Sequence, residues 1–296
     1  MLNRINIINN EIILNVISHS INNIKAILIH LHGLGNNFQP IPDFNTCNNI
    51  SSIENKIKYF SSLNILSFAL ELRGHGLSGG KRFTINSIDE YISDINCLVE
   101  YIKKNHQDIP IYIIGESLGG ALAIKYSILN KDIISGIILL APMCGVHIET
   151  YSKQLLYYLL IGFSYIYPSY ELNIKGKDLS SNNIKYLEAK KKCIYTNNGN
   201  IRADTARECY YTTLWINKNI HLLTTPIIAF HSNKDVITNS RATEDIINRC
   251  SSTNKQLVLM EEGDHLLLIH MNDEDVLPDK IMTTIYNWLN ELINYI

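Results

Sequence analysis

The chain has 296 residues, of which 46% are hydrophobic and 18% are charged, and its formal net charge is −2. Disorder requires low hydrophobicity together with high net charge, so this composition predicts a globular protein. Nucleic-acid binding depends on clustered Lys and Arg that neutralise phosphates, and the chain has no block of about five basic residues. We therefore expect no nucleic-acid partner.

Short apolar runs bounded by turn residues alternate with longer amphipathic stretches. This alternation is typical of βαβ units and a largely parallel sheet. Several runs are nearly continuous Ile, Leu and Val, as expected of strands that are covered on both faces. The sequence predicts an α/β fold with a mostly parallel central sheet flanked by helices. Strands are expected at residues 11–18, 26–31, 64–70, 111–114, 135–140, 226–230 and 256–260.

A helix is predicted over residues 87–104, because Ser87 and Glu90 can form a capping box and apolar residues follow at three-and-four spacing. Further helices are expected at residues 118–129, 240–250 and 280–293.

Residues 145–219 interrupt this rhythm. They contain Tyr- and Leu-rich helical stretches at residues 151–167 and 203–215 around a polar middle, without a convincing strand. Because they lie between two expected strands, they predict a helical cap inserted over one end of the sheet. Residues 1–144 and 220–296 would then form one core.

The candidate nucleophile is Ser117, in G-E-S-L-G-G at residues 115–120. This G-x-S-x-G motif follows an expected strand and precedes an expected helix, which is the context that a nucleophile elbow requires. A serine hydroxyl needs a base oriented by a carboxylate. Asp235 and His265 follow in the required order, each in a loop after an expected strand. Separately, Asp235 could cap a helix near Thr238 and His265 could be an ordinary loop residue, but those roles would not explain why all three converge.

Acyl transfer also needs donors for the negative charge on the carbonyl oxygen. The backbone N–H of Leu118, first in the helix after Ser117, is one candidate. The N–H of Leu34 is the other, in a loop where Gly33 and Gly35 permit close approach. A plain glycine turn is the alternative for that loop.

Three motifs carry a resemblance to α/β-hydrolases of the monoacylglycerol lipase and lysophospholipase group: H-G-L-G at 32–35, R-G-H-G-L-S-G at 73–79, and the elbow. The resemblance spans nearly the whole chain. It implies a Ser117, Asp235 and His265 triad, oxyanion donors at Leu34 and Leu118, and a mobile cap that shapes an acyl-binding tunnel. Many animal members carry His where this chain has Glu116, and some plant members carry Glu.

Other polar residues of these motifs are expected to support the loops. Arg73 and His75 are expected to hold the loop next to the elbow by hydrogen bonds. His30 and His32 are expected to support the oxyanion loop.

We therefore expect a serine esterase or lipase that cleaves a single-chain lipid ester, a monoacylglycerol or lysophospholipid. Gly33, Leu159 and Phe163 are the expected substrate contacts. The apolar cap helix could cover an acyl chain or touch a membrane, or it could pack on the protein's own core. The alternatives are a hydrolase of small esters or peptides, an acyltransferase, and a non-catalytic receptor on a hydrolase scaffold. No metal or cofactor is expected, and no oligomeric state follows from the sequence.

The cysteines and the apolar segments bear on location. The six cysteines form no C-x-x-C pair, which favours free thiols in a reducing compartment. The N-terminus lacks a signal-peptide cleavage site, and the longest apolar stretch, residues 155–167, is well short of the ~20 residues that cross a bilayer. We expect a cytoplasmic protein, with peripheral membrane contact left open.

Overall fold

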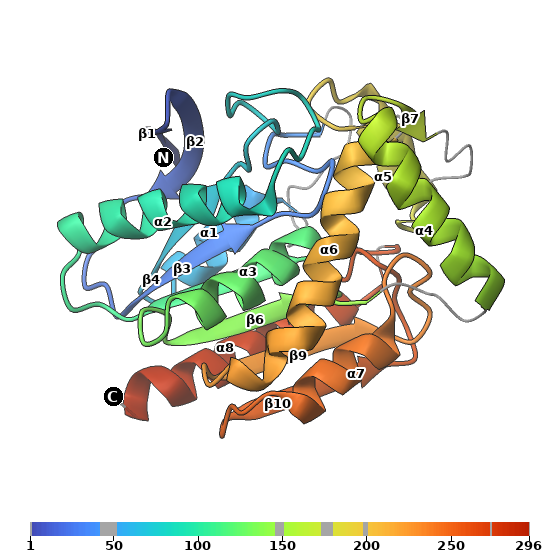
Figure 1. Cartoon of the computed structure of the whole chain (residues 1–296). Coiled ribbons are helices and arrows are strands. Elements are labelled where there is room, and N and C mark those ends of the chain that lie inside the picture. Colours follow the sequence, from blue (N-terminus) through green and yellow to red (C-terminus); the bar gives the residue numbers. More distant parts are fainter. Residues whose placement is uncertain are drawn as a thin grey trace.

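An eight-stranded sheet forms the centre of the molecule (Figure 1). The computed structural model describes residues 2–41, 52–145, 151–172, 180–197, 201–272 and 274–295, except the side chains of 151–157 and 295. The strand order is β1-β2-β4-β3-β5-β6-β9-β10. The β1–β2 and β2–β4 pairs are antiparallel and the other pairs are parallel. The strands are β1 (Leu2–Asn9), β2 (Ile12–His19), β3 (Ala26–Leu31), β4 (Ile65–Leu70), β5 (Ile111–Glu116), β6 (Gly136–Leu140), β9 (Ile227–Ser232) and β10 (Lys255–Met260).

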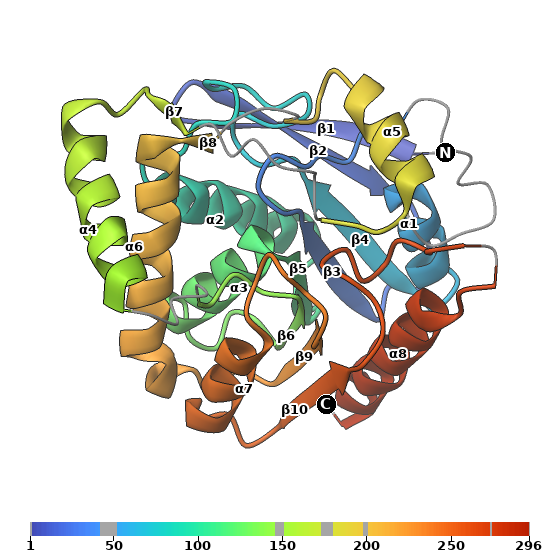
Figure 2. The same cartoon turned by 90° about the vertical axis from the view of Figure 1, so that its right-hand side faces the viewer.

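Helices cover both faces of this sheet. One face carries α2 (Ile88–Asn105), α3 (Leu118–Leu129), α6 (Ala203–Asn219) and α7 (Ser240–Arg249), and the other carries α1 (Ile53–Ser61) and α8 (Leu277–Tyr295). Viewed toward the carboxyl ends of the parallel strands, α4 (Tyr151–Ile166), α5 (Ile184–Lys192) and α6 surround the loops that follow those strands (Figure 2). Among the described helices, none has the length and apolar character needed to cross a membrane.

The buried strands fill both cores. In β3, Ile27 and Ile29 pack in the cluster under α2 and α3, whereas Ala26 and Leu28 pack in the cluster under α8. Successive strand side chains point to opposite faces, so an almost continuous apolar run is what a two-sided sheet needs. The seven predicted strands are confirmed, with ends that differ by at most two residues.

The four predicted core helices are confirmed as well. The side chain of Ser87 caps α2 by accepting a hydrogen bond from Asp89 N at 3.1 Å. The prediction of a full capping box is wrong. The carboxylate of Glu90, expected to bond the backbone N–H of Ser87, lies 3.8 Å from the guanidinium of Arg73 instead.

Several elements were not predicted. Strand β1 pairs with β2 over its whole length, but its Asn and Arg residues weaken the apolar signal. Helices α1 and α5 were also missed. The expectation of no strand in the insertion is wrong in detail, since β7 (Glu171–Leu172) and β8 (Ile201–Arg202) form a short antiparallel pair.

Helix α3 lies so close to β3 that Gly119 has no room for a side chain. A Cβ at this position would lie 2.2 Å from the carbonyl oxygen of Leu31 and 2.9 Å from that of His32.

We expect Gly119→Ala to lower the free energy of unfolding in urea by about 3 kcal/mol or more, because backbone would have to move. Gly162→Ala is the matched control: a Cβ there meets nothing within 4 Å, and Ala favours the helix by about 1 kcal/mol. Equal effects of the two substitutions would contradict the close contact.

Candidate active site

Ser117 lies between β5 and α3 in a strained backbone conformation. Its φ of 52° and ψ of −112° are unusual for a residue that is not glycine. A Cβ at Gly115 would lie 2.3 Å from the carbonyl oxygen of Gly119, which explains the glycines around the turn. Strain of this kind persists only where the surrounding structure enforces it, and it clusters at functional sites. The elbow predicted from the motif is therefore present.

The loop after β3 lies against Ser117. A Cβ at Gly33 would be 3.2 Å from the Cβ and 3.8 Å from the Oγ of Ser117, so glycine allows this approach. Within the described part of the chain, the N–H groups of Leu34 and Leu118 donate to no protein acceptor. Leu34 directly follows Gly33 in the sequence, and Leu118 directly follows Ser117. Two unpaired donors therefore flank the serine, as an oxyanion site requires.

Two buried histidines brace this loop. His32 Nε2 accepts a hydrogen bond from Leu72 N at 3.1 Å, so Nδ1 carries the proton and donates to Gly33 O at 2.8 Å. His75 Nε2 accepts from Gly35 N at 3.1 Å. Both imidazoles are neutral in these roles. Burial lowers the pKa of His32 to about 4 and the pKa of His75 to about 3.

Arg73, His75 and His30 can be compared with their predicted supporting roles. Arg73 donates from Nε and from a terminal guanidinium nitrogen to Asp94 at 3.0 and 2.7 Å, which ties its loop to α2. The hydrogen bond from His75 to the oxyanion loop fits its expected supporting role. His30, by contrast, lies within β3 and contacts Ser67 Oγ at 3.1 Å, so it supports the sheet beneath the loop.

Glu71 is a supporting residue that sequence reasoning missed. Its side chain is fully buried and accepts hydrogen bonds from Phe38 N, Asn15 Nδ2, Gln39 Nε2 and Leu77 N at 2.7–3.1 Å. These donors come from β2 and from the loops after β3 and β4, which His32 and His75 link by hydrogen bonds. A buried carboxylate requires such compensation. The sequence offered only its place just before the R-G-H-G motif as a signal.

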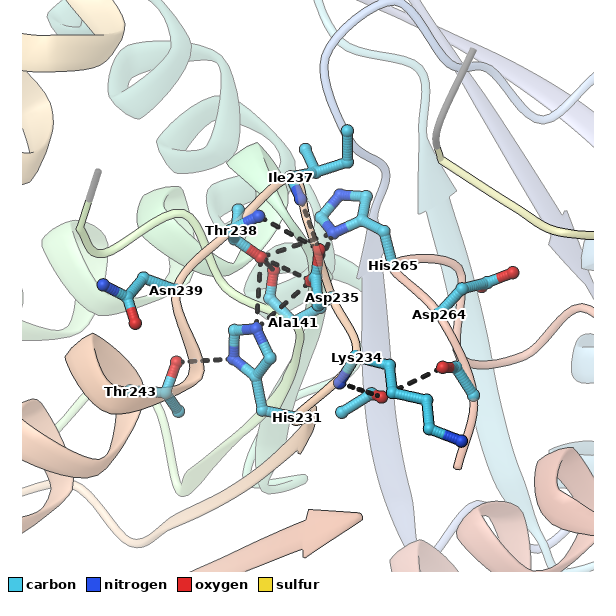
Figure 3. A network of polar contacts seen from close by, with 12 residues as sticks. Ala141, His231, Lys234, Asp235, Ile237, Thr238, Asn239, Thr243, Asp264 and His265 are labelled. Atoms are coloured by element: carbon cyan, nitrogen blue, oxygen red, sulfur yellow. Dashed lines mark hydrogen bonds and ion pairs between the residues drawn. The ribbon is translucent and has the colours of Figure 1, made fainter. Parts of the chain in front are cut away.

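Asp235 and His265 meet at the carboxyl edge of the sheet (Figure 3). Asp235 Oδ2 lies 2.7 Å from His265 Nδ1, and the Asp235 side chain is fully buried. Asp235 Oδ1 accepts from the backbone N–H groups of Ile237 and Thr238 at 2.7 and 3.1 Å. The N-cap of α7 is Asn239, so Asp235 shapes its own loop and does not cap that helix.

Two more side chains contact the oxygen that faces His265. The hydroxyl of Thr238 donates to Asp235 Oδ2 at 2.7 Å, and His231 Nε2 lies 3.2 Å from the same atom. Burial alone would raise the pKa of Asp235. Hydrogen bonds from His231, His265 and Thr238, together with the charge of His265, instead hold it well below its usual range. Asp235 is therefore ionised at neutral pH.

The segment after β6 connects Ser117 to the Asp235 loop. Ser117 N donates to Leu140 O at 3.0 Å, and Met143 N donates to Ser117 O at 2.9 Å. Between them, Ala141 O lies 3.2 Å from the hydroxyl oxygen of Thr238, whose proton goes to Asp235 at the shorter distance of 2.7 Å. One short segment therefore contacts both halves of the candidate site.

Leu159 and Phe163, the predicted substrate contacts in the cap, both lie on α4. Leu159 lies on α4 with 63% of its surface exposed. Phe163 packs against Tyr167 and Tyr170 with ring centroids 5.2 and 5.1 Å away. Contact of either residue with substrate stays a prediction. Within the described ranges, no three His, Cys, Asp or Glu side chains are grouped so that they could hold a metal ion.

The neutral histidines predict acid-dependent stability. The folded protein keeps His30, His32 and His75 uncharged, with pKa values of about 3, 4 and 3, whereas the unfolded chain binds protons near pH 6.5. Their stabilisation is therefore complete above about pH 6.5 and is lost as the pH falls toward 4. Each contributes a slope of ~1.4 kcal/mol per pH unit.

Urea unfolding between pH 7 and 4.5 measures this slope. Burial raises the pKa of Asp264 and works in the opposite direction, so a variant comparison is cleaner than the wild-type slope. We expect His75→Gln to reduce the slope by ~1.4 kcal/mol per pH unit, because Gln does not titrate. Identical slopes in the two proteins would show that His75 titrates normally in the folded state.

Comparison with known proteins identifies the family of this chain. Residues 46–273 match the hydrolase family described as "Serine aminopeptidase, S33". Monoglyceride lipase of Mus musculus is 22% identical over 91% of this chain and 84% of its own length. Caffeoylshikimate esterase of Arabidopsis thaliana is 23% identical over 79% of this chain and 71% of its own length.

The fold has close counterparts among solved structures. The crystal structure of Paleococcus ferrophilus monoacylglycerol lipase superposes with a TM-score of 0.76 at 18% identity, over 96% of this chain and 99% of that chain. The resemblance to the monoacylglycerol lipase group is confirmed, and the α/β-hydrolase fold with it. Since the family match covers most of its length, the chain belongs to the serine aminopeptidase S33 family of α/β-hydrolases.

Proposed function

We propose that this chain is a serine-dependent carboxylic ester hydrolase with Ser117, His265 and Asp235 as its triad. The observation that carries the proposal is the buried 2.7 Å contact between Asp235 and His265, at the same sheet edge as the strained Ser117. The similarity to lipases and esterases supports ester hydrolysis as the reaction.

The hydrogen bond between Asp235 and His265 fits the role of His265 as the base. Asp235 accepts the Nδ1–H of His265, which leaves Nε2 free of a proton and able to remove the proton of Ser117 as it attacks the ester carbonyl. The N–H groups of Leu34 and Leu118 receive the oxyanion. His265 returns the proton to the leaving alcohol, and water then cleaves the acyl-enzyme by the same route.

Residues 145–219 would act as the cap over this site. Part of this insertion is tied to the oxyanion loop, since Asn197 N donates to Gly35 O at 2.9 Å. The insertion is also tied to the loop that carries His265. Asn182 N donates to Asp264 Oδ2 at 2.7 Å, and Leu266 N donates to Ser180 O at 3.2 Å. These contacts on both site loops support a cap whose α5 segment is fixed and whose α4 end would move.

A single-chain lipid ester is the substrate that we infer. Two of the similar proteins carry monoacylglycerol or monoglyceride lipase in their names. Helix α4 exposes more than half the surface of Tyr158, Leu159, Tyr165 and Ile166, and such a surface could receive an acyl chain or touch a membrane. We propose that the protein works in the cytoplasm and contacts membranes peripherally.

Peptide hydrolysis is the second candidate, because the family description names an aminopeptidase. The same triad cleaves esters and amides, so the machinery alone does not separate the two reactions.

A substrate series separates the candidates. We expect kcat/KM for monoacylglycerols or lysophosphatidylcholines of long acyl chain to exceed that for p-nitrophenyl acetate, because the acyl chain adds ~0.8 kcal/mol per buried methylene. Aminoacyl p-nitroanilides serve as the peptidase probe. Preference for the acetate would overturn the lipid assignment, and faster cleavage of the anilides would favour the aminopeptidase.

Variants of the triad test its assignment. Ser117→Ala and His265→Ala should each lower kcat by about 10⁴-fold or more and abolish labelling by a fluorophosphonate probe. Thr283→Ala is the control, since this exposed residue lies on α8 and its hydroxyl contacts the helix carbonyl of Asp279 and the hydroxyl of Tyr59. A folded Ser117→Ala protein that keeps full activity would contradict the proposal.

A further inference from the structure

His231 makes a second histidine contact with the carboxylate of Asp235. It lies near the end of β9 and its side chain is fully buried. His231 Nε2 is 3.2 Å from Asp235 Oδ2, on the same oxygen that His265 contacts, and His231 Nδ1 is 2.7 Å from Thr243 Oγ1 (Figure 3). The three-residue mechanism leaves this imidazole without a role.

The direction of the hydrogen bonds follows from the chemistry of the partners. An ionised carboxylate only accepts, so His231 Nε2 carries a proton and donates to Asp235. On the other side, burial raises the pKa of Cys144 to about 12, which keeps it a thiol, and its Sγ lies 3.4 Å from Thr243 Oγ1. The thiol can donate to Thr243, and the Thr243 hydroxyl can then donate to His231 Nδ1. A neutral His231 satisfies every group in this chain.

The ionisable groups beside the pair include Lys234, which precedes Asp235 and points away from its carboxylate (Figure 3). Asp264 precedes His265 and accepts from Asn182 N and Leu266 N. Cys144 is a buried thiol. A neutral donor on Asp235 Oδ2 therefore changes the charge that His265 meets without adding a cation.

We propose that His231 is a positioning residue for the triad: its Nε2–H holds Asp235 Oδ2 beside His265 and withdraws part of the negative charge of that oxygen. This inference rests on the proposed function of Asp235 and His265. Without the donor, Oδ2 carries more charge toward His265 and has one restraint fewer. The imidazolium form of His265 then becomes more stable, and its orientation less fixed.

Substitution by Leu and by Gln separates these effects from simple loss of packing. In His231→Leu, the acid limb of kcat/KM should move to higher pH by about 0.5 to 1 unit, and the plateau should fall by roughly tenfold. In His231→Gln, the side-chain amide places an N–H near the position of Nε2, so the acid limb should return to its wild-type pH.

A buried histidine elsewhere provides the control. His30 is buried in β3 with its Nε2 on Ser67 Oγ, and His30→Leu should cost stability without moving the acid limb. An unmoved acid limb in an active His231→Leu protein, or an equal shift in His30→Leu and His231→Leu, would overturn the inference.

Titration of His265 by NMR gives a readout that does not depend on turnover. We expect the pKa of His265 to rise in His231→Leu and to stay at the wild-type value in His231→Gln. An unchanged His265 titration in His231→Leu would also refute the coupling. If the wild-type protein neither cleaves esters nor labels with the fluorophosphonate, the proposed function fails, and this titration still decides whether His231 acts on the Asp235–His265 pair.

Discussion

Helix α3 can begin directly after β5 because no side chain stands between its first turn and β3. A Cβ at Gly119 would lie 2.2 Å from the carbonyl oxygen of Leu31, and one at Gly33 would lie 3.2 Å from the Cβ of Ser117. These two glycines bring the elbow and the loop after β3 together. The positive φ of Ser117, the nearness of the Leu34 and Leu118 N–H groups, and the proposed chemistry all depend on that approach.

The loops around this contact are held by buried polar groups. His32 and His75 are neutral acceptors for backbone N–H groups, and Glu71 accepts from backbone and amide donors. Asp235 is ionised beside two imidazoles and a hydroxyl. Buried polar groups of this kind are costly unless every donor and acceptor is matched. The site is therefore rigid where it forms hydrogen bonds, and it depends on pH through histidines that do not themselves react.

The sequence predicted the parts of this arrangement that have a local signal. The strands of the parallel sheet were visible as apolar runs, and the carboxyl ends of parallel strands share one edge, so Asp235 and His265 could be expected near Ser117. Strand β1 was not predicted, because it is an edge strand rich in polar residues. Its position in the sheet depends on pairing with β2. Helix α1 had a usable signal, with Ser52 as N-cap and Ile53, Ile57 and Phe60 on one face.

Residues that act through contacts distant in sequence had no such signal. Glu71 is one buried carboxylate among many acidic residues until its donors from β2 and the two loops are known. His231 lies four residues before Asp235, a separation that does not by itself place the imidazole on the carboxylate. Only the turn of the loop after β9 and the position of Thr243 on α7 bring them together.

The central claim is that Ser117 carries the acyl group during turnover. Acid quenching during the burst with a p-nitrophenyl ester of a long-chain acid, followed by proteolysis and mass spectrometry, measures this directly. The account predicts a peptide containing Ser117 that is heavier by one acyl group, with no such peptide from His265→Ala. Turnover with the acyl group on another residue, or with no acyl-enzyme at any quench time under burst conditions, would contradict it.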